Sequence, residues 1–333
     1  MNRASVLFYD DLANLLDLST LTTLSTKLSQ KVNWTIPFQT HLSRRKYYRL
    51  EVRAGYERGK RTVYATYKEI GEYEYVNNFP AVDDWRYTRV AEIHIFGGVR
   101  IDDKGFQLML TEITKALKYW DGKTSLSWSK HDFLSSEQDA ALTDLLKDVP
   151  FTRLYFKTES KPILISPSQV TDGRLQYLNL ESSGNWDEEV ISILCVLIGQ
   201  PKFGKLALTE TSSEDFGLKI FEACLKKWMT DEKFQFHVRA RVEDATPGVA
   251  KFLKQCHEKD GVTHFARRHS PNSNYYVLAR YTETEKEAIL TMCSINKNRK
   301  FDDFPQDIYV QHPLHKPPRG CLKAIFNGTD FVL

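Results

Sequence analysis

Four residues in the last third of the chain are of the types that hold metal ions: Cys256, His257, His264 and His269. Thiolate and imidazole groups are the usual ligands of zinc. Their spacing matches no zinc pattern, and a neighbouring Cys and His on one backbone do not readily reach the same ion. We therefore predict that the protein holds no metal and needs no cofactor.

The chain contains none of the short motifs that carry well-understood catalytic mechanisms. It has no GxSxG nucleophile elbow, no GxxxxGK[ST] phosphate loop, no GxGxxG fingerprint and no HExxH zinc motif. The adjacent acids Asp83-Asp84, Asp102-Asp103 and Asp302-Asp303 diverge on any regular element and are typical of solvated turns. We predict no catalytic residue and expect a binding protein rather than an enzyme.

The composition is that of a folded protein without a dominant charge. Of the 333 residues, 41% are hydrophobic and 12% are aromatic, which is enough to build a core and argues against disorder. A net charge of +3, with acids and bases interspersed, gives no electrostatic footprint for nucleic acid. The cysteines include no CxxC pair, which indicates reduced thiols. They are Cys195, Cys224, Cys256, Cys293 and Cys321.

No attachment to a membrane is expected. Met1–Tyr9 has a single basic residue and is followed by Asp10 and Asp11, so no signal peptide is predicted. The longest apolar stretch, Val190–Ile198, is too short to span a bilayer. We expect a protein of the cytoplasm or the nucleus.

A six-residue pattern, apolar at its first, fourth and sixth positions, recurs along the middle of the chain. Four copies are apolar at all three positions, and two carry Lys at the first. The copies are Val90–Ile95, Lys123–Trp128, Phe151–Phe156, Leu175–Leu180, Phe203–Leu208 and Lys233–Val238. Their fourth positions, residues 93, 126, 154, 178, 206 and 236, are 24 to 33 residues apart, which indicates one supersecondary unit per copy.

Segments with helical periodicity separate these copies. Turn residues such as Asp121-Gly122 and Gly199-Gln200-Pro201 would end them, and Ser135-Ser136-Glu137 is suited to begin one. The predicted helices lie around residues 106–117, 137–146, 187–197, 216–225 and 247–256. The repeating unit is therefore strand, turn, helix, turn, and each unit buries its apolar face against its neighbours.

Two architectures fit this alternation: an open α/β solenoid of stacked units and a doubly wound α/β sheet. Strands of a doubly wound sheet are covered on both faces and are continuously apolar. Here the strands are short and the positions between the apolar ones are polar, which favours the solenoid. These polar positions would bind a protein client: Glu92, His94, Ser127, Arg153, Tyr155, Tyr177, Asn179, Lys205 and His237.

The six-residue pattern resembles the LxxLxL core of a leucine-rich repeat of the long, helix-containing kind, over about half of the chain. The resemblance implies an open α/β solenoid with a role in protein binding. The family's Asn or Cys a few residues after each strand is replaced here, for example by Gly97-Gly98 and Ser182-Ser183. The repeats are therefore degenerate copies.

Residues 1–45 differ from the rest. Their apolar residues have helical spacing with breaks at Asp17 and Ser19-Thr20, which predicts two or three short helices. Nine of them occur in the order typical of one known module: Leu7, Phe8, Leu12, Leu15, Leu16, Leu18, Leu21, Leu24 and Trp34. The segment thus resembles an F-box, which docks cullin–RING ubiquitin ligases through a Skp-type adaptor, although the family's opening Pro is missing.

An F-box-like head followed by degenerate repeats resembles the F-box families of nematodes. The resemblance implies that the nine head residues bind a Skp-type adaptor and that the repeat surface holds a client for ubiquitination. A second hypothesis makes the head only a cap over the first repeat, in an interaction or antagonist protein without a ligase link. A third, an α/β enzyme, predicts a deep pocket with perturbed carboxylates or histidines at strand ends.

The remaining segments are predicted to be β-rich. Tyr47–Arg53 and Arg61–Tyr67 would form a hairpin around Gly55–Gly59, and Glu72–Tyr75 would add a strand. Later strands are expected at 263–267, 275–281 and 288–295, followed by an extended tail. The expected α/β fold thus divides into an F-box-like head (1–45), a β-rich entry (46–87), the leucine-rich-repeat-like solenoid (88–258) and a β-hairpin cap with the tail (259–333).

Overall fold

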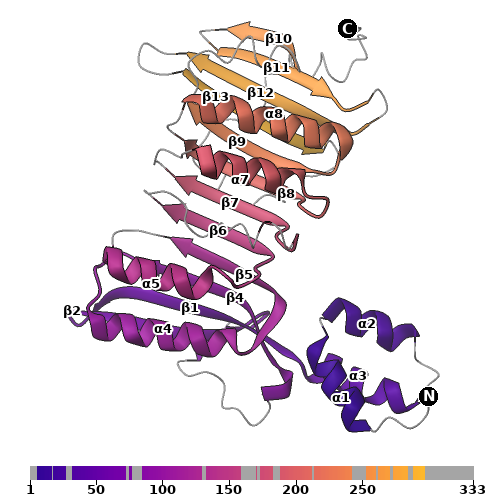
Figure 1. Ribbon diagram of the computed structural model, residues 1–333, viewed down its shortest axis with the longest axis vertical. Helices are drawn as coiled ribbons and strands as arrows, with labels where there is room; N and C mark the ends of the chain where they lie inside the picture. Colours follow the sequence, from indigo (N-terminus) through magenta and orange to yellow (C-terminus); the bar gives the residue numbers. More distant parts are fainter. Residues whose placement is uncertain are drawn as a thin grey trace. The chain divides into compact units, whose positions relative to one another are not determined.

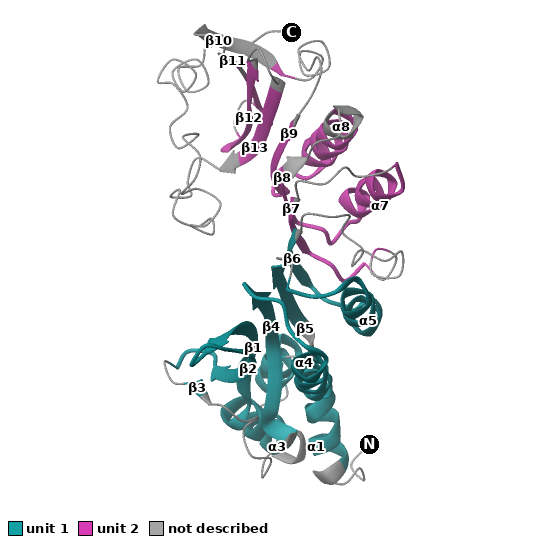
Figure 2. Ribbon diagram, turned by 90° about the vertical axis from the view of Figure 1, so that its left-hand side faces the viewer, with its two compact units in different colours: residues 1–157 teal, residues 158–333 magenta. Residues whose placement is uncertain are grey.

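The computed structural model of the chain is a mixed α/β protein, as expected (Figure 1). The structure describes residues 6–16, 18–27, 32–72, 75–76, 85–129, 133–158, 170, 173–182, 188–211, 214–241, 253–259, 262–270, 273–283 and 288–296. The chain forms two compact units, unit 1 (residues 1–157) and unit 2 (residues 158–333), which Figure 2 colours separately. The boundary between them falls inside the segment that was predicted as one solenoid.

Unit 1 begins with helices and continues as a mixed sheet. Its helices are α1 (Val6–Leu15), α2 (Leu18–Lys27), α3 (Val32–Arg44), the short 3-10 helix η1 (Trp85–Tyr87), α4 (Asp103–Leu117) and α5 (Ser136–Leu146). Its strands are β1 (Lys46–Glu57), β2 (Lys60–Glu69), β3 (Tyr75–Val76), β4 (Thr88–Gly97), β5 (Trp120–Ser129) and β6 (Arg153–Thr158). The order across the sheet is β3-β2-β1-β4-β5-β6, in which β1, β4, β5 and β6 are parallel.

The helices α1, α2 and α3, which we call the head, pack around a small apolar core. Ala13, Leu21 and Phe38 are fully buried there. Partly buried leucines surround them: Leu12, Leu16, Leu24 and Leu42. The head ends at Arg44, where the sequence predicted a boundary at residue 45.

Two arginines join the head to the sheet. Arg45, just before β1, donates hydrogen bonds to the carbonyls of Ala13 (2.9 Å) and Leu16 (2.6 Å). Arg89 on β4 donates to the carbonyl of Asn14 (2.6 Å). These carbonyls lie at the C-terminal end of α1, where the helix dipole favours a cation. The arginines therefore cap α1 and fix it to the starts of two strands.

The hairpin predicted around Gly55–Gly59 is confirmed, because β1 and β2 pair antiparallel from Tyr48 to Glu57. Its tight turn holds Arg58 and Gly59, both with positive φ, as a two-residue hairpin turn requires. The first two helices between repeat copies are also confirmed, and Ser135 begins α5 with a capping box. Figure 2 shows α4 and α5 on one side of β4 and β5.

The core of unit 1 lies between these helices and the sheet. The apolar positions of the repeat copies are buried on the strands: Ile93, Ile95, Leu126, Trp128, Leu154 and Phe156. Opposite them the helices bury Phe106, Met109, Ile113, Ala116, Leu142 and Leu146. A strand with one apolar and one polar face is what the six-residue pattern predicted.

Unit 2 repeats the strand–helix alternation and ends in an antiparallel sheet. Its helices are α7 (Glu188–Gly199) and α8 (Glu214–Thr230) among the described residues. Its described strands are β7 (Tyr177–Ser182), β8 (Lys205–Thr211), β9 (Gln235–Arg241), β10 (Lys254–Lys259), β11 (Val262–Arg268), β12 (Tyr275–Glu283) and β13 (Ala288–Asn296). Their order is β7-β8-β9-β13-β12-β11-β10, with β7, β8 and β9 parallel and the later neighbours antiparallel.

The strands predicted at 263–267, 275–281 and 288–295 are confirmed as β11, β12 and β13. The helix predicted at 247–256 is wrong at its end, since Lys254–Lys259 is strand β10. Strand β10 forms there because it pairs with β11 in a hairpin. The short apolar run that predicted a helix carries no information about this pairing. Residues 242–252 lie outside the described residues. No helix in the described part of the chain is both long and apolar enough to cross a membrane.

Candidate functional site

One face of the unit 1 sheet, on the side away from α4 and α5, carries mostly polar side chains, and we call it the open face. Along β4, for example, Ile93 and Ile95 are buried while Glu92, His94 and Phe96 are half-buried. Residues on neighbouring strands that are Cα partners of Glu92, His94 and Phe96 lie on the same face of the sheet. The open face comprises Tyr64, Thr66 and Lys68 on β2, Arg49, Glu51 and Arg53 on β1, Glu92, His94 and Phe96 on β4, Ser125, Ser127 and Ser129 on β5, and Arg153, Tyr155 and Lys157 on β6.

A network of charges occupies β1 and β4 on the open face. Arg49 donates to Glu92 at 2.5 Å and lies 3.8 Å from Glu51, whose other oxygen accepts a 2.6 Å bond from Arg53. His94 lies 3.5 Å from Glu92. Hydrogen bonds from His94 and then from Arg49 lower the pKa of the Glu92 carboxyl to about 2, against the opposing effect of burial. Glu92 is therefore ionised at neutral pH.

The structure brings five of the predicted client-binding residues together on this open face. His94, Ser127 and Tyr155 are Cα partners across β4, β5 and β6 and so form one row. Glu92 and Arg153 both pair with Ser125 in the neighbouring row. Arg153 is exposed, and the other four are half-buried.

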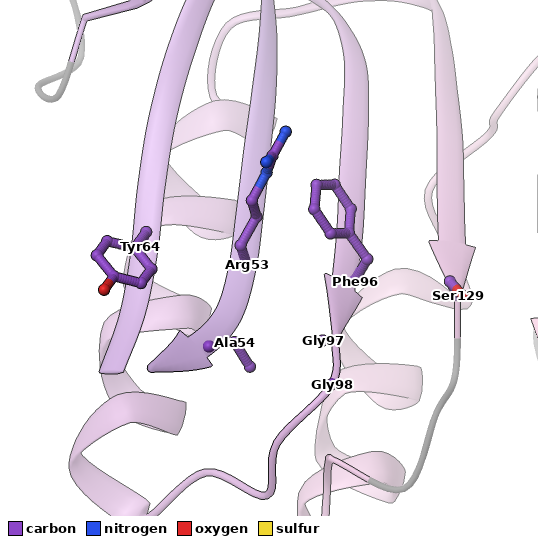
Figure 3. Close-up of a pocket in the computed structure, with 8 residues that line it drawn as sticks. Arg53, Ala54, Tyr64, Phe96, Gly97, Gly98 and Ser129 are labelled. Carbon is purple, nitrogen blue, oxygen red and sulfur yellow. The ribbon is translucent and has the colours of Figure 1, made fainter. Parts of the chain in front are cut away.

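A shallow cavity of about 400 Å³ lies at the carboxyl ends of β1 and β4 (Figure 3). The Arg53 guanidinium lies 4.6 Å from the centre of the Phe96 ring, and Tyr64 and Ser129 flank this pair. A Cβ at Gly97 would lie 2.8 Å from Ala54 Cβ and 2.8 Å from the ring of Phe133, so a glycine is required beside the cavity. Open α/β sheets commonly bind ligands beyond the carboxyl ends of their strands.

The sequence did not single out Arg49, Glu51, Arg53 and Phe96. The first three lie on β1, which is outside the six-residue repeat and meets β4 only through a parallel pairing between distant segments. A signal was present, because Arg49-x-Glu51-x-Arg53 places three alternating charges on one face of a predicted strand.

The other predicted client-binding residues lie in unit 2. Tyr177 on β7 is 6% exposed, and the ammonium of Lys205 on β8 lies 4.9 Å from the centre of its ring. Asn179 and His237 flank the buried Ala207 in one row across β7, β8 and β9. The nine predicted residues thus form one group in each unit.

The residues predicted to bind an adaptor divide into two sets. Phe8, Leu15 and Leu18 are exposed on α1 and α2, as is Ile36 on α3, which the sequence did not single out. The others with described side chains pack within the head: Leu12, Leu16, Leu21 and Leu24. Leu7 and Trp34 belong to α1 and α3, but their side chains lie outside the described part.

No group of three or more His, Cys, Asp or Glu side chains is arranged to hold a metal ion in the part of the chain that the structure describes. Of the four residues considered from the sequence, His257 and His264 are Cα partners on β10 and β11. His269 instead approaches α8, 3.2 Å from the Met229 carbonyl and 3.7 Å from Glu232.

Comparison with models of protein families, with curated proteins and with solved structures finds no match for this chain. Its function is therefore inferred from the residues and geometry described above.

Proposed function

We propose that the protein is an F-box-like substrate receptor, in which the head binds a Skp-type adaptor and the polar sheet faces hold a client for ubiquitination. The observation that carries the proposal is the apolar surface of the head. Phe8, Leu15, Leu18 and Ile36 are 54%, 82%, 43% and 56% exposed. Each apolar Å² left in water costs about 25 cal/mol, so four such side chains on one small module support a protein partner for the head.

The attachment of the head supports this role, because a substrate receptor must hold its adaptor and its client in a fixed geometry. Besides the capping arginines, Asp10 on α1 lies 3.1 Å from both His41 and Arg86. Tyr87 packs against His41, with ring centres 4.8 Å apart, and lies under the Arg44 guanidinium at 4.5 Å. These contacts tie α1 and α3 to η1, directly before β4.

The proposal includes a leucine-rich-repeat-like solenoid as the client-binding scaffold. The support is the register of the repeat copies, whose equivalent positions are Cα partners on neighbouring strands. Fourth positions pair as Ile93–Leu126–Leu154 in unit 1 and as Leu178–Leu206–Phe236 in unit 2. Stacked repeats require this alignment, since each unit buries the same positions against its neighbours.

Retention of a purified Skp-type adaptor on the immobilised full-length chain tests the proposal. Leu15→Asp places a charge on the exposed face of α1 and should abolish retention without unfolding the head. Val196→Asp, at a 56% exposed position on α7, is the matched control and should retain the adaptor. If the unmodified chain retains none while a known F-box protein does, the proposal is wrong.

An alternative is an interaction or antagonist protein without a ligase link, whose head is a cap. The observation that favours it is the packing within the head of the buried Leu21 and the partly buried Leu12, Leu16 and Leu24, where they stabilise the module. In that case deletion of residues 1–34 should lower the melting temperature and the solubility but leave client binding intact. Loss of client binding on deletion would exclude this alternative.

A further inference from the structure

The open face of unit 1 has more bases than acids. Its two acids, Glu51 and Glu92, are both paired with arginines of β1. Against them stand five basic side chains: Arg49, Arg53, Lys68, Arg153 and Lys157. Among the fifteen side chains named for the open face, basic groups therefore outnumber acidic ones, and complementarity favours an acidic partner.

One row of the open face runs across the strands and links the cavity to β6. Arg53 pairs with Tyr64 on one side and Phe96 on the other, Phe96 pairs with Ser129, and Ser129 pairs with Lys157. The row thus begins at the exposed Arg53, whose guanidinium lies over the Phe96 ring and also pairs with Glu51, and ends at the exposed residue Lys157. Figure 3 shows Arg53, Phe96 and Ser129 side by side, in front of the helices.

The spacing of the two cations limits what can bind them. Arg53 and Lys157 are three strand steps apart, about 14 Å at roughly 4.8 Å per step. An extended peptide rises about 3.4 Å per residue, so acidic residues at positions i and i+4 span nearly the same distance. The intervening residues would then contact the Phe96 ring and the Ser129 hydroxyl.

We propose that the client segment recognised by unit 1 is an acidic, extended peptide laid along this row, with one carboxylate at Arg53 and another, four residues away, at Lys157. This inference rests on the proposed function in one respect only, namely that the bound peptide is part of a client. Nucleic acid fits the row less well, because its phosphates repeat far more closely than the roughly 14 Å between the two cations, and the phosphates in between would meet Phe96 and Ser129.

Binding of fluorescent ten-residue peptides to the full-length chain, followed by anisotropy at low salt, tests the inference. One peptide carries two Glu at i and i+4 in a neutral background, a second has the same two Glu adjacent, and a third has Gln at both positions. The i,i+4 peptide should bind most tightly. Arg53→Gln and Lys157→Gln should each weaken its binding by about two- to fivefold, as for exposed ion pairs.

Lys60→Gln, an exposed site at the hairpin tip and outside the row, is the matched control and should bind the peptide as the unmodified chain does. Equal binding of the i,i+4 and adjacent peptides, no binding of either, or tighter binding of a single-stranded RNA would overturn the inference. Adaptor retention is measured on the same variants and should not change. A chain that binds the peptide but no adaptor would contradict the proposed ligase role and leave this inference standing.

Discussion

Glu92 shows how a single side chain couples the open face to the stability of unit 1. Its carboxyl accepts a hydrogen bond from Arg49 and lies beside His94, and the side chain is 28% exposed. The pKa of the group falls from 4.5 to about 2 in the folded chain. The unfolded chain therefore binds more protons between these values, so the stabilisation is complete above pH 4.5 and is lost as the pH falls toward 2.

We predict that Glu92→Gln lowers the free energy of unfolding at pH 7 by about 1–2 kcal/mol, because Arg49 loses a charged acceptor. The variant should also lose less stability than the unmodified chain between pH 5 and pH 3. Urea unfolding at several pH values measures both effects. Glu57→Gln, at the exposed end of β1, is the control. If the free energy of unfolding changes with pH in the same way for the unmodified chain and for Glu92→Gln, then Glu92 does not cause the loss of stability at low pH.

At the scale of elements, the start of α5 is fixed by a reciprocal pair of hydrogen bonds. The Ser135 hydroxyl accepts from the Gln138 amide at 3.2 Å, and the Gln138 side-chain oxygen accepts from the Ser135 amide at 3.1 Å. Gln138 also donates to Asp103 in the first turn of α4 at 3.2 Å. The capping box therefore joins the starts of two neighbouring helices.

Ser135→Ala should destabilise unit 1 by about 1 kcal/mol, because the Gln138 amide loses its acceptor at the N-terminus of α5. Ser136→Ala changes an exposed residue one position later, where alanine is a good helix former, and should change stability little. Thermal unfolding of the two variants side by side provides the measurement. A loss of equal size in both would show that the capping box is not the cause.

The elements also show which parts of the fold the sequence can reveal. The strands of the repeat copies were predicted because apolar residues at the fourth and sixth positions mark one buried face. The strands β6, β7 and β8 nevertheless begin two residues after their copies, since Phe151, Leu175 and Phe203 are buried in the preceding turns. A residue can be buried in a turn as well as in a strand. The six-residue pattern therefore predicted which residues are buried better than it predicted where each strand begins.

The candidate site was only half predicted for a similar reason. The polar positions on β4, β5 and β6 follow from the repeat, whereas Arg49 and Arg53 enter the site through the pairing of β1 with β4. That pairing joins distant segments, and no local pattern reports it. The exposed Ile36 was missed because it lies in α3, beyond the leucines that carry the F-box resemblance.

At the scale of the whole molecule, each of the two compact units buries residues of the repeat copies, which provide equivalent positions for comparing the units. Leu126 on β5 and Leu206 on β8 both occupy the fourth position of a copy. They are 0% and 1% exposed, and each lies on a strand that has parallel neighbours on both sides. Truncating either side chain leaves a cavity at a buried position of one unit.

We predict that Leu126→Ala and Leu206→Ala each cost about 2–5 kcal/mol, as for buried leucines in other cores. Contacts in stacked repeats act mainly between neighbours, so the loss should stay within the altered unit. Hydrogen exchange should therefore quicken in β4, β5 and α4 for Leu126→Ala, and in β8, β9 and α8 for Leu206→Ala. If either variant quickens exchange equally in both units, the chain unfolds as a single cooperative body and the two cores are not independent.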